Sequence, residues 1–293
     1  MPIKTTARRR FRLRLGSRAL VLGERTLVMG VLNVTPDSFS DGGLYLDSQS
    51  AVAHALAMEH AGADLIDIGA ESTRPGSVPV RPAEQIRLLL PVLKELRGQL
   101  RVPISVDTQS AEVAEAAADG GAQILNDVSA LRAGPELAKV AARHRLALIL
   151  MHMRGTPATM QRGPFARDAM RDVVGSLRRA VRQARAAGVT KDRIVLDPGF
   201  GFGKRHAQNF ELLARLPELA RLGFPIAIGP SRKSSIGWAQ TGKTEVPPVA
   251  ERLWGTAAAV TAAILCGAHI VRVHDVAEMA QVARVADSVL DGI

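Results

Sequence analysis

The feature of this sequence that most constrains its fold is a regular alternation of short apolar runs with longer stretches of helical character. Eight runs rich in Val, Ile and Leu are typical of buried strands. The stretches between them are rich in Ala, and glycines stand near their ends as helix C-caps do, at Gly62, Gly121, Gly188, Gly223 and Gly267. The predicted strands are Leu27–Leu32, Asp64–Ile68, Pro103–Val106, Gln123–Leu125, Ala147–Met151, Arg193–Leu196, Pro225–Ile228 and His269–Val273.

Eight strand–helix units predict an α/β fold in which parallel strands are joined by helical crossovers. A closed (β/α)8 barrel, the TIM barrel, is the most economical arrangement, and a doubly wound open sheet is the alternative. The length of 293 residues is normal for one such barrel, so we expect a single domain over 1–293. Apolar residues make up 47% of the chain but aromatic residues only 3%, so Ala, Val, Leu and Ile must build the core.

The N-terminal segment differs from the repeating units. Residues 1–10 form a basic arm, and residues 11–26 alternate apolar and basic positions around Gly16 and Gly23, which predicts a β-hairpin. We expect this hairpin to cover the bottom of the barrel. The longest apolar stretch, Leu253–Ala268, contains Gly and Thr and is short for a membrane span, so it is interpreted as a buried helix.

The net charge of +10 is compatible with a nucleic acid, an anionic membrane or an anionic substrate as partner. The chain has no aromatic platforms and no recognised nucleic-acid motif, so we expect the basic runs Arg8–Arg10 and Arg167–Arg185 to be solvated surface. The single cysteine, Cys266, excludes an internal disulfide and is predicted to be a small core residue. We therefore expect a cytoplasmic protein that binds neither nucleic acid nor membrane.

Polar side chains follow nearly every predicted strand. In a barrel these groups converge on one mouth, where active sites of barrel enzymes lie. The polarity of loops in general accounts for some of them, but not for carboxylates and amides that come directly after apolar strands. In strand order they are Asn33 with Thr35–Phe39, Glu71–Gly76, Asp107 with Thr108, Asn126 with Asp127, His152, Asp197–Gly199, Ser231–Ser234, and His274 with Asp275.

These polar groups divide into two chemical sets. Asp107, Asn126, Asp197 and Lys233 suit a flat polar heterocycle, because a carboxylate accepts two parallel N–H bonds and an Asn both donates and accepts. The second set suits an anion and consists of Asn33, Arg74, Arg272 and His274, with Asn33 also able to serve Mg²⁺.

The segment Pro198–Lys204 looks superficially like a phosphate loop. It lacks the P-loop spacing and the Ser or Thr after the lysine. We therefore exclude a nucleotide site there.

Eight motifs together resemble the dihydropteroate synthase family, in order and with compatible spacing from about residue 27 to residue 280. They are NVTPDSFSDGG (Asn33–Gly43), DIGAESTRPGS (Asp67–Ser77), SVDT (Ser105–Thr108), NDVSAL (Asn126–Leu131), MHMRGTP (Met151–Pro157), LDPGFGFGK (Leu196–Lys204), SRKSSIG (Ser231–Gly237) and RVHDV (Arg272–Val276). The resemblance implies a (β/α)8 barrel, a homodimer, and a transferase of folate biosynthesis. Its reaction joins 6-hydroxymethyl-7,8-dihydropterin diphosphate to 4-aminobenzoate by a dissociative, SN1-like substitution that needs no covalent nucleophile.

The resemblance also implies roles for individual residues. The pterin would meet Asp107, Asn126, Met151, Asp197, Phe202 and Lys233. The diphosphate would meet Asn33, Thr73, Arg74, Arg272 and His274, with Mg²⁺ held by Asn33 and Asp37. The aminobenzoate would meet Phe39, Thr73, Pro75, Ser231, Arg232 and Lys233, where sulfonamides are also expected to bind. The catalytic set would be Asp107, Asp197, Lys233, Arg272 and His274.

Two other pterin-binding proteins fit part of this pattern. A pterin-dependent methyltransferase with the same barrel would share the carboxylates and the amide but would not need the anion set. A non-catalytic paralogue would not need intact loops at Asn33–Phe39 and Ser72–Pro75. The residues alone leave open whether Asp67 and Glu71 are catalytic or are buried, hydrogen-bonded barrel residues.

Overall fold

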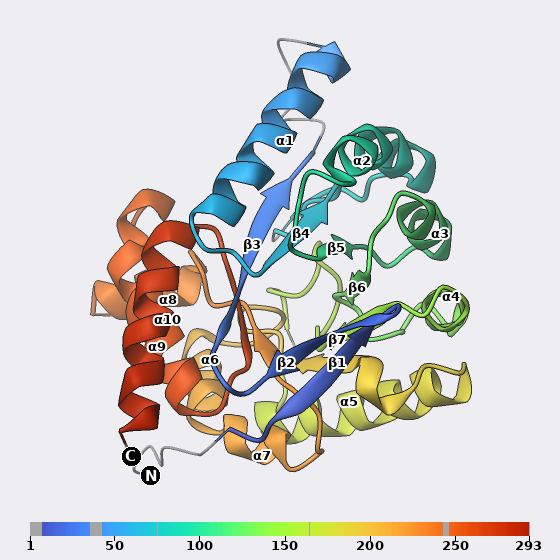
Figure 1. The fold of residues 1–293 in the computed structure, drawn as a ribbon. Coiled ribbons are helices and arrows are strands. Elements are labelled where there is room, and N and C mark those ends of the chain that lie inside the picture. Colours follow the sequence, from blue (N-terminus) through green and yellow to red (C-terminus); the bar gives the residue numbers. More distant parts are fainter. Residues whose placement is uncertain (1–7, 36–42, 75, 164, 243–245, 293) are drawn as a thin grey trace.

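The computed structural model describes residues 8–35, 43–74, 76–163, 165–242 and 246–292, and only the backbone of residues 43–47. Eight parallel strands pair in the order β8-β7-β6-β5-β4-β3-β10-β9. A backbone bridge between Leu196 and Ile226 joins β8 to β9 and closes the ring (Figure 1). The strands are β3 (Leu27–Asn33), β4 (Leu65–Gly69), β5 (Ile104–Asp107), β6 (Ile124–Asp127), β7 (Ala147–Met151), β8 (Ile194–Asp197), β9 (Ala227–Ile228) and β10 (Ile270–Val273). The predicted (β/α)8 barrel is confirmed, and the open doubly wound sheet is excluded.

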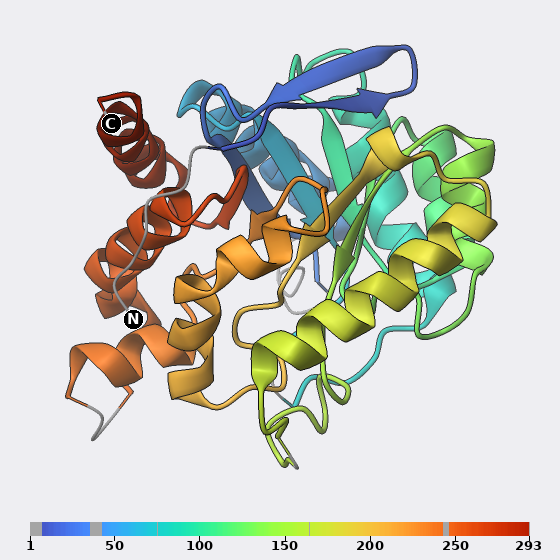
Figure 2. The same cartoon turned by 90° about the horizontal axis from the view of Figure 1, so that it is seen from below.

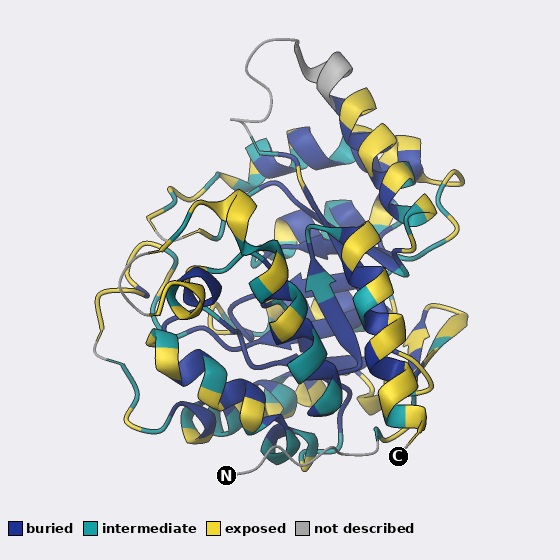
Figure 3. Cartoon of the chain, turned by 90° about the vertical axis from the view of Figure 1, so that its left-hand side faces the viewer, coloured by how far each residue is buried: buried dark blue, intermediate teal, exposed yellow. Residues whose placement is uncertain are grey.

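Helices surround the ring of strands and bury one face each against it (Figures 1 and 3). Cys266 caps the end of α9 and is 1% exposed, in agreement with its predicted place in the core. Within the described part of the chain, no helix combines the length and the apolar character that crossing a membrane requires. The helices are α1 (Gly43–His60), α2 (Pro82–Leu96), α3 (Ala111–Asp119), α4 (Glu136–Arg143), α5 (Ala169–Ala186), η2 (Lys191–Arg193), α6 (His206–Ala214), α7 (Leu216–Ala220), α8 (Ser234–Gln240), η3 (Val249–Arg252), α9 (Leu253–Leu265) and α10 (Val276–Asp291).

The predicted hairpin consists of β1 (Phe11–Leu15) and β2 (Arg18–Leu22), which pair antiparallel. It lies across the end of the barrel where the strands begin (Figures 1 and 2). Leu13, Leu15 and Leu22 are buried and pack with the first inward-facing residues of the barrel strands. Hairpin leucines thus close the amino-terminal end of the barrel, as expected from the alternation of apolar and basic residues.

The interior of the barrel changes from apolar to polar along the strands. Successive side chains of a strand point to opposite faces, so residues two apart share the interior. On β4, Leu65 belongs to the apolar layer behind the hairpin, and Asp67 comes two residues later; β6 repeats this with Ile124 and Asn126. The polar layer therefore lies at the carboxyl ends of the strands.

Strand boundaries differ slightly from the predicted ones. Asp107 and Asp197 were expected to follow their strands but are the last residues of β5 and β8, because backbone pairing with the neighbouring strands continues past the apolar run. The predicted strand Pro225–Ile228 shortens to Ala227–Ile228, with only the isolated bridge at Ile226 before it.

Candidate active site

A small pocket of about 20 Å³ lies in the polar layer at the carboxyl ends of the strands. All six residues that the family resemblance assigns to the pterin line it. Thr73 and Arg272, predicted for the anion, line it as well, so the two sets share one cavity. Its lining consists of Thr73, Asp107, Asn126, Val128, Met151, Asp197, Phe200, Phe202, Gly229, Lys233 and Arg272.

Asp67 anchors the pocket from behind. One of its carboxylate oxygens, Oδ2, accepts hydrogen bonds from Arg272 Nε at 2.6 Å and from Asn126 Nδ2 at 3.0 Å. Its other oxygen, Oδ1, is buried and has no hydrogen-bond partner among the described residues. Asp67 is therefore a buried residue that orients two pocket side chains, which answers the question that the sequence left open.

Arg272 links Asp67 to the pocket wall, since its Nη2 donates to Asp107 Oδ2 at 3.3 Å. Burial raises the pKa of Asp107 to about 7, and the positive charge of Arg272 opposes this shift. Burial likewise raises the pKa of Asp197 to about 6, although the Gly199 amide donates to its Oδ1 at 2.6 Å. Both carboxyls therefore stand near their titration point at neutral pH, where an N–H-rich ligand can displace their protons.

An apolar wall faces the two carboxyls. Val128, Met151 and Phe202 pack together there and are nearly buried. Lys233 Nζ lies over the Phe202 ring, 4.0 Å from its centroid. Burial and the positive charge of nearby Arg272 together lower the pKa of Lys233 to about 8. A flat heterocycle fits between such a wall and the polar groups, with a donor available from Lys233.

Ser231 and His274 form a contact at the mouth. Ser231 Oγ accepts from the His274 backbone amide at 3.2 Å, which directs its own hydroxyl hydrogen to His274 Nδ1 at 3.1 Å. The imidazole proton then lies on Nε2. Burial lowers the pKa of His274 to about 3, with the charge of Arg272 adding to the effect. His274 can thus serve an anion as a neutral N–H donor.

Arg232 pairs with Asp275: Nε donates to Oδ2 at 3.0 Å and Nη2 contacts Oδ1. Its backbone has a φ of +59°, and its amide donates to Thr256 Oγ1 at 3.1 Å. Arg252 donates to its carbonyl oxygen at 2.8 Å. This left-handed conformation at a non-glycine residue costs energy, and the surrounding hydrogen bonds hold it in place.

The remaining predicted residues lie at the rim or outside the described part. Asn33, at the end of β3, and Arg74 are exposed. Asp37, Phe39 and Pro75 lie outside the described residues, so their assignments stay predictions.

Glu71 accepts a hydrogen bond from Gln85 Nε2 at 2.9 Å. Burial raises its pKa. It does not line the pocket, so the structure places it with the supporting residues of the barrel rather than in the site.

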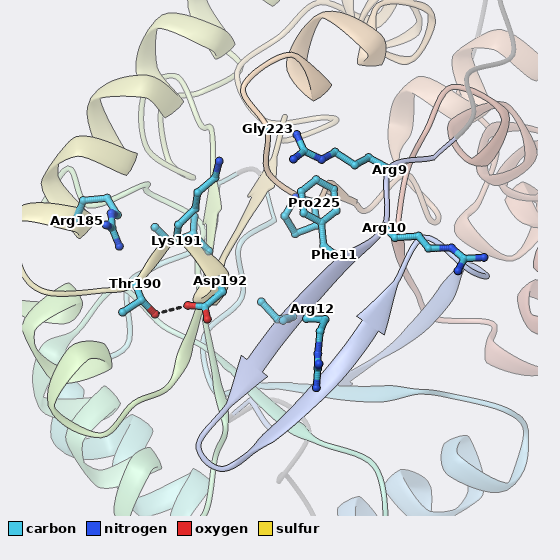
Figure 4. A pocket seen from close by; sticks show the side chains of 12 residues that line it. Arg9, Arg10, Phe11, Arg12, Arg185, Thr190, Lys191, Asp192, Gly223 and Pro225 are labelled. Carbon is cyan, nitrogen blue, oxygen red and sulfur yellow. Dashed lines mark hydrogen bonds between the residues drawn. The ribbon is translucent and has the colours of Figure 1, made fainter.

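A second cavity of about 600 Å³ lies at the opposite end, between the hairpin and η2 (Figure 4). Arg9 and Lys191 extend into it, and Phe11 and Pro225 form an apolar side. Its one lining carboxylate, Asp192, accepts a hydrogen bond from Thr190. Because barrel enzymes carry their chemistry at the carboxyl ends of the strands, this basic groove does not compete for the active site.

Sequence reasoning missed several members of the site. Val128, Phe200 and Gly229 line the pocket, but apolar residues near strand ends carry no signal that separates pocket from core. Lys204 is buried, and its Nζ donates to the carbonyl oxygens of Gly199 and Phe202. The sequence signal that could have identified Lys204 is its position after a glycine-rich turn. The structure agrees that this turn is not a phosphate loop, since the lysine faces inward.

Comparisons with known proteins agree with this geometry. A family profile described as "Pterin binding enzyme" matches residues 29–274. A dihydropteroate synthase of Synechocystis sp. is 48% identical over 266 residues, which cover 91% of each chain.

Two solved structures have the same fold. The dihydropteroate synthase of Yersinia pestis with a sulfonamide drug complex is 40% identical, with a TM-score of 0.88 over 96% of this chain and 100% of that one. The dihydropteroate synthase of Xanthomonas albilineans in complex with 7,8-dihydropteroate is 42% identical, with a TM-score of 0.83 over 95% of this chain and 98% of that one. The predicted resemblance is confirmed, and the chain belongs to the dihydropteroate synthase family of pterin-binding enzymes.

Proposed function

We propose that this protein is a transferase that condenses 6-hydroxymethyl-7,8-dihydropterin diphosphate with 4-aminobenzoate to give 7,8-dihydropteroate and diphosphate. The observation that carries the proposal is the pocket in which Asp107, Asn126, Asp197 and Lys233 surround one cavity. The family relationship supports it, including the Xanthomonas structure that holds 7,8-dihydropteroate.

The pterin ring would lie between the apolar wall and the carboxyls. Asp107 and Asp197 would accept N–H bonds from opposite edges of the ring, and Asn126 would both donate and accept. Lys233 would donate to the ring carbonyl. Because Asp107, Asn126 and Asp197 are buried residues of strand ends, they are held rigidly before the ligand arrives.

The diphosphate would lie towards the mouth, against Thr73, Arg74, Arg272 and the Nε2–H of His274. We propose that Mg²⁺ accompanies it. The described residues hold no cluster of three His, Cys, Asp or Glu side chains that could bind a metal alone. An exposed amide at Asn33 nevertheless fits a Mg²⁺ whose other ligands are phosphate oxygens and water, with Asp37 as a second protein ligand. Bound there, Mg²⁺ would neutralise charge on the leaving group.

We propose a dissociative order of bond changes. The C–O bond between the pterin methylene and the diphosphate breaks first, and its electron pair leaves with the diphosphate. The conjugated pterin carries the resulting cation, which the negative charges of Asp107 and Asp197 stabilise. The aminobenzoate nitrogen then attacks the methylene and loses a proton. No side chain needs to form a covalent bond.

The aminobenzoate would bind nearer the rim. Ser231, Arg232 and Lys233 lead into α8, with Thr73 opposite and Phe39 and Pro75 from the loops. The guanidinium of Arg232 is already paired with Asp275 and the hydroxyl of Ser231 with His274, so Lys233 is the better candidate for a polar contact with the carboxylate. Sulfonamides would occupy the same place, and the Yersinia relative is known in a sulfonamide complex.

We also propose that the protein works as a cytoplasmic homodimer. Large apolar side chains are exposed near the C-terminal end, with Trp254 79%, Val285 67% and Val289 49% exposed. Contact with a second copy would remove these side chains from water. Light scattering of the purified protein would test the dimer.

A direct assay tests the proposed reaction. The protein, the pterin diphosphate, 4-aminobenzoate and Mg²⁺ are expected to yield dihydropteroate and diphosphate in equal amounts. Turnover of the pterin diphosphate without product containing aminobenzoate would contradict the proposal. A methyltransferase would instead bind the pterin but leave the diphosphate ester intact.

A further inference from the structure

Lys204 is a buried lysine that the reaction described above does not use. Its side chain comes from the turn after β8 and is 3% exposed. Lysine is rarely buried to this extent, because removing an ammonium from water is costly unless polar groups replace the solvent. Burial lowers its pKa to about 7, while Asp197 and Asp172 oppose that shift.

The ammonium of Lys204 gathers carbonyl oxygens of the turn in which it lies. Nζ donates to Gly199 O at 2.8 Å and to Phe202 O at 2.9 Å. It also contacts His152 Nδ1 at 3.0 Å, and His152 Nε2 lies 3.4 Å from Asp172 Oδ2. Burial lowers the pKa of His152 to about 4, so the ring is neutral and its Nδ1 accepts. Each N–H of the ammonium thus has a partner.

The turn that Lys204 closes is packed without spare room. Gly199 and Gly203 have positive φ values of +69° and +67°. A Cβ at Gly199 would lie 1.8 Å from His152 O, and one at Gly203 would lie 2.3 Å from Arg154 O. Glycine lets the turn approach the end of β7 this closely, and the lysine then fills the space enclosed by its carbonyls.

Two pocket groups depend on this turn. The amide of Gly199 donates to Asp197 Oδ1 at 2.6 Å and so sets the direction of that carboxyl. Phe202, whose carbonyl binds Lys204, carries the ring beneath Lys233 Nζ. A shift of the turn would move both of these groups.

We infer that Lys204 is a positioning residue for the pterin pocket, whose buried ammonium holds the turn and thereby sets the geometry of Asp197 and Phe202. This inference rests on the proposed function, since it names what shapes the pterin subsite. Lys204 touches no substrate, so its effect must pass through the turn. It should act on pterin binding and leave the diphosphate end of the site unaffected, because Arg272 and His274 belong to β10 and its extension.

The test replaces Lys204 by Met, which keeps the length of the side chain but removes the charge and all donors. Lys139→Met on α4, where the lysine is exposed, is the matched control. Calorimetric titration should show pterin affinity reduced about tenfold or more, as expected when binding groups are misplaced by about 1 Å. Diphosphate affinity should remain within about twofold of the wild-type value. Unchanged pterin affinity, or equal loss of both ligands, would overturn the inference.

Two further measurements keep the outcome clear. In the absence of ligand, amide exchange in residues 198–203 should be faster in Lys204→Met than in wild type, and unchanged exchange would contradict the inference. Lys204→Ala is the variant to use if Lys204→Met does not fold. Its pterin affinity should return when propylammonium is added, because propylammonium supplies the three carbons and the ammonium that alanine lacks. Failure of propylammonium to restore pterin affinity would also contradict the inference. If the wild-type protein itself binds no pterin, the proposed function is contradicted. The amide-exchange measurement still shows in that case whether Lys204 holds the turn.

Discussion

Arg272 donates from Nε to Asp67 Oδ2 over 2.6 Å, although no part of the Asp67 side chain reaches solvent. This pair lies inside the barrel and connects β10 to β4, the two strands that flank β3. It fixes the direction of the guanidinium that also contacts Asp107. The buried carboxylate therefore controls a residue of the pocket without lining the pocket itself.

Asp67→Asn is expected to destabilise the protein, because the half-buried guanidinium of Arg272 loses its nearest counter-charge. Breaking one half of a buried pair costs about 3 kcal/mol of unfolding free energy. Urea unfolding at pH 7.5 would measure it. Glu84→Gln, which removes an exposed partner of Arg87, is the control and should leave the unfolding midpoint unchanged. Equal midpoints for Asp67→Asn and wild type would show that the pair contributes little.

Asp197→Asn is expected to lose pterin binding while gaining stability. An amide turned to the ligand presents a donor where an acceptor is needed, and the unpaired group costs roughly 1–3 kcal/mol of binding free energy. Since the pKa of Asp197 is raised to about 6, the folded state binds more protons than the unfolded state between about pH 4 and 6. The free energy of unfolding of the wild-type protein therefore decreases as the pH rises from about 4 to 6. Above pH 6 the Asn variant should be more stable than wild type by on the order of 1 kcal/mol.

Calorimetric titration and thermal unfolding at pH 8 would check both parts of this prediction, with Asp119→Asn on the exposed end of α3 as control. Retained pterin affinity would remove Asp197 from the binding site. A lower stability at pH 8 would mean that its contact with Gly199 outweighs its burial.

Pterin affinity is expected to fall as the pH drops through about 7. Asp107 has its pKa raised to about 7 by burial, and only its charged form offers two acceptors to the ring. Binding should therefore release a fraction of a proton near neutral pH and none at pH 9. Titration in two buffers with different ionisation enthalpies would measure the released protons. Asp107→Asn should remove the release near pH 7; the same release from this variant would assign it to another group.

Arg272→Ala is expected to weaken diphosphate binding much more than pterin binding. The arginine supplies the positive charge nearest the proposed leaving group, whereas the pterin keeps Asn126, Asp197 and Lys233. Separate titrations with diphosphate and with a pterin would measure the two effects. Equal loss of both affinities would mean that the pair with Asp67 maintains the pocket as a whole, and that the arginine has no particular role towards the anion.

Sulfonamides are expected to inhibit by competing with 4-aminobenzoate. Both molecules carry an aromatic amine opposite an acidic oxygen group, and Lys233 offers a donor for that group. Initial-rate kinetics at several concentrations of each would decide. The apparent inhibition constant should rise in proportion to 4-aminobenzoate; inhibition that does not decrease as 4-aminobenzoate rises would place the drug elsewhere.

The barrel and most of the pocket could be predicted because both follow from position along the strands. Asp107, Asn126 and Asp197 end apolar strands, and the closed ring brings such ends together. Asp67 lies two residues further inside β4, where the sequence cannot distinguish a catalytic carboxylate from a supporting one. Its role depends on Arg272, which is distant along the chain.

Contacts that depend on the path of a turn were also beyond the sequence. Lys204 faces inward because the glycines before it allow the turn to fold back on β7, which no periodic pattern encodes. Arg232 was expected to meet the aminobenzoate, but its pairing with Asp275 depends on the unusual backbone conformation at that position.

The leucines of the hairpin have a consequence for the order of events in catalysis. Because Leu13, Leu15 and Leu22 stop one end of the barrel, molecules reach the polar layer from the opposite end. If the aminobenzoate binds nearer the mouth than the pterin, as proposed above, an aminobenzoate already in place would stand in the path of the incoming pterin. A barrel closed at one end would therefore make binding ordered: the pterin diphosphate would enter first and the arylamine second, and the joined product would have to leave before the next pterin could enter.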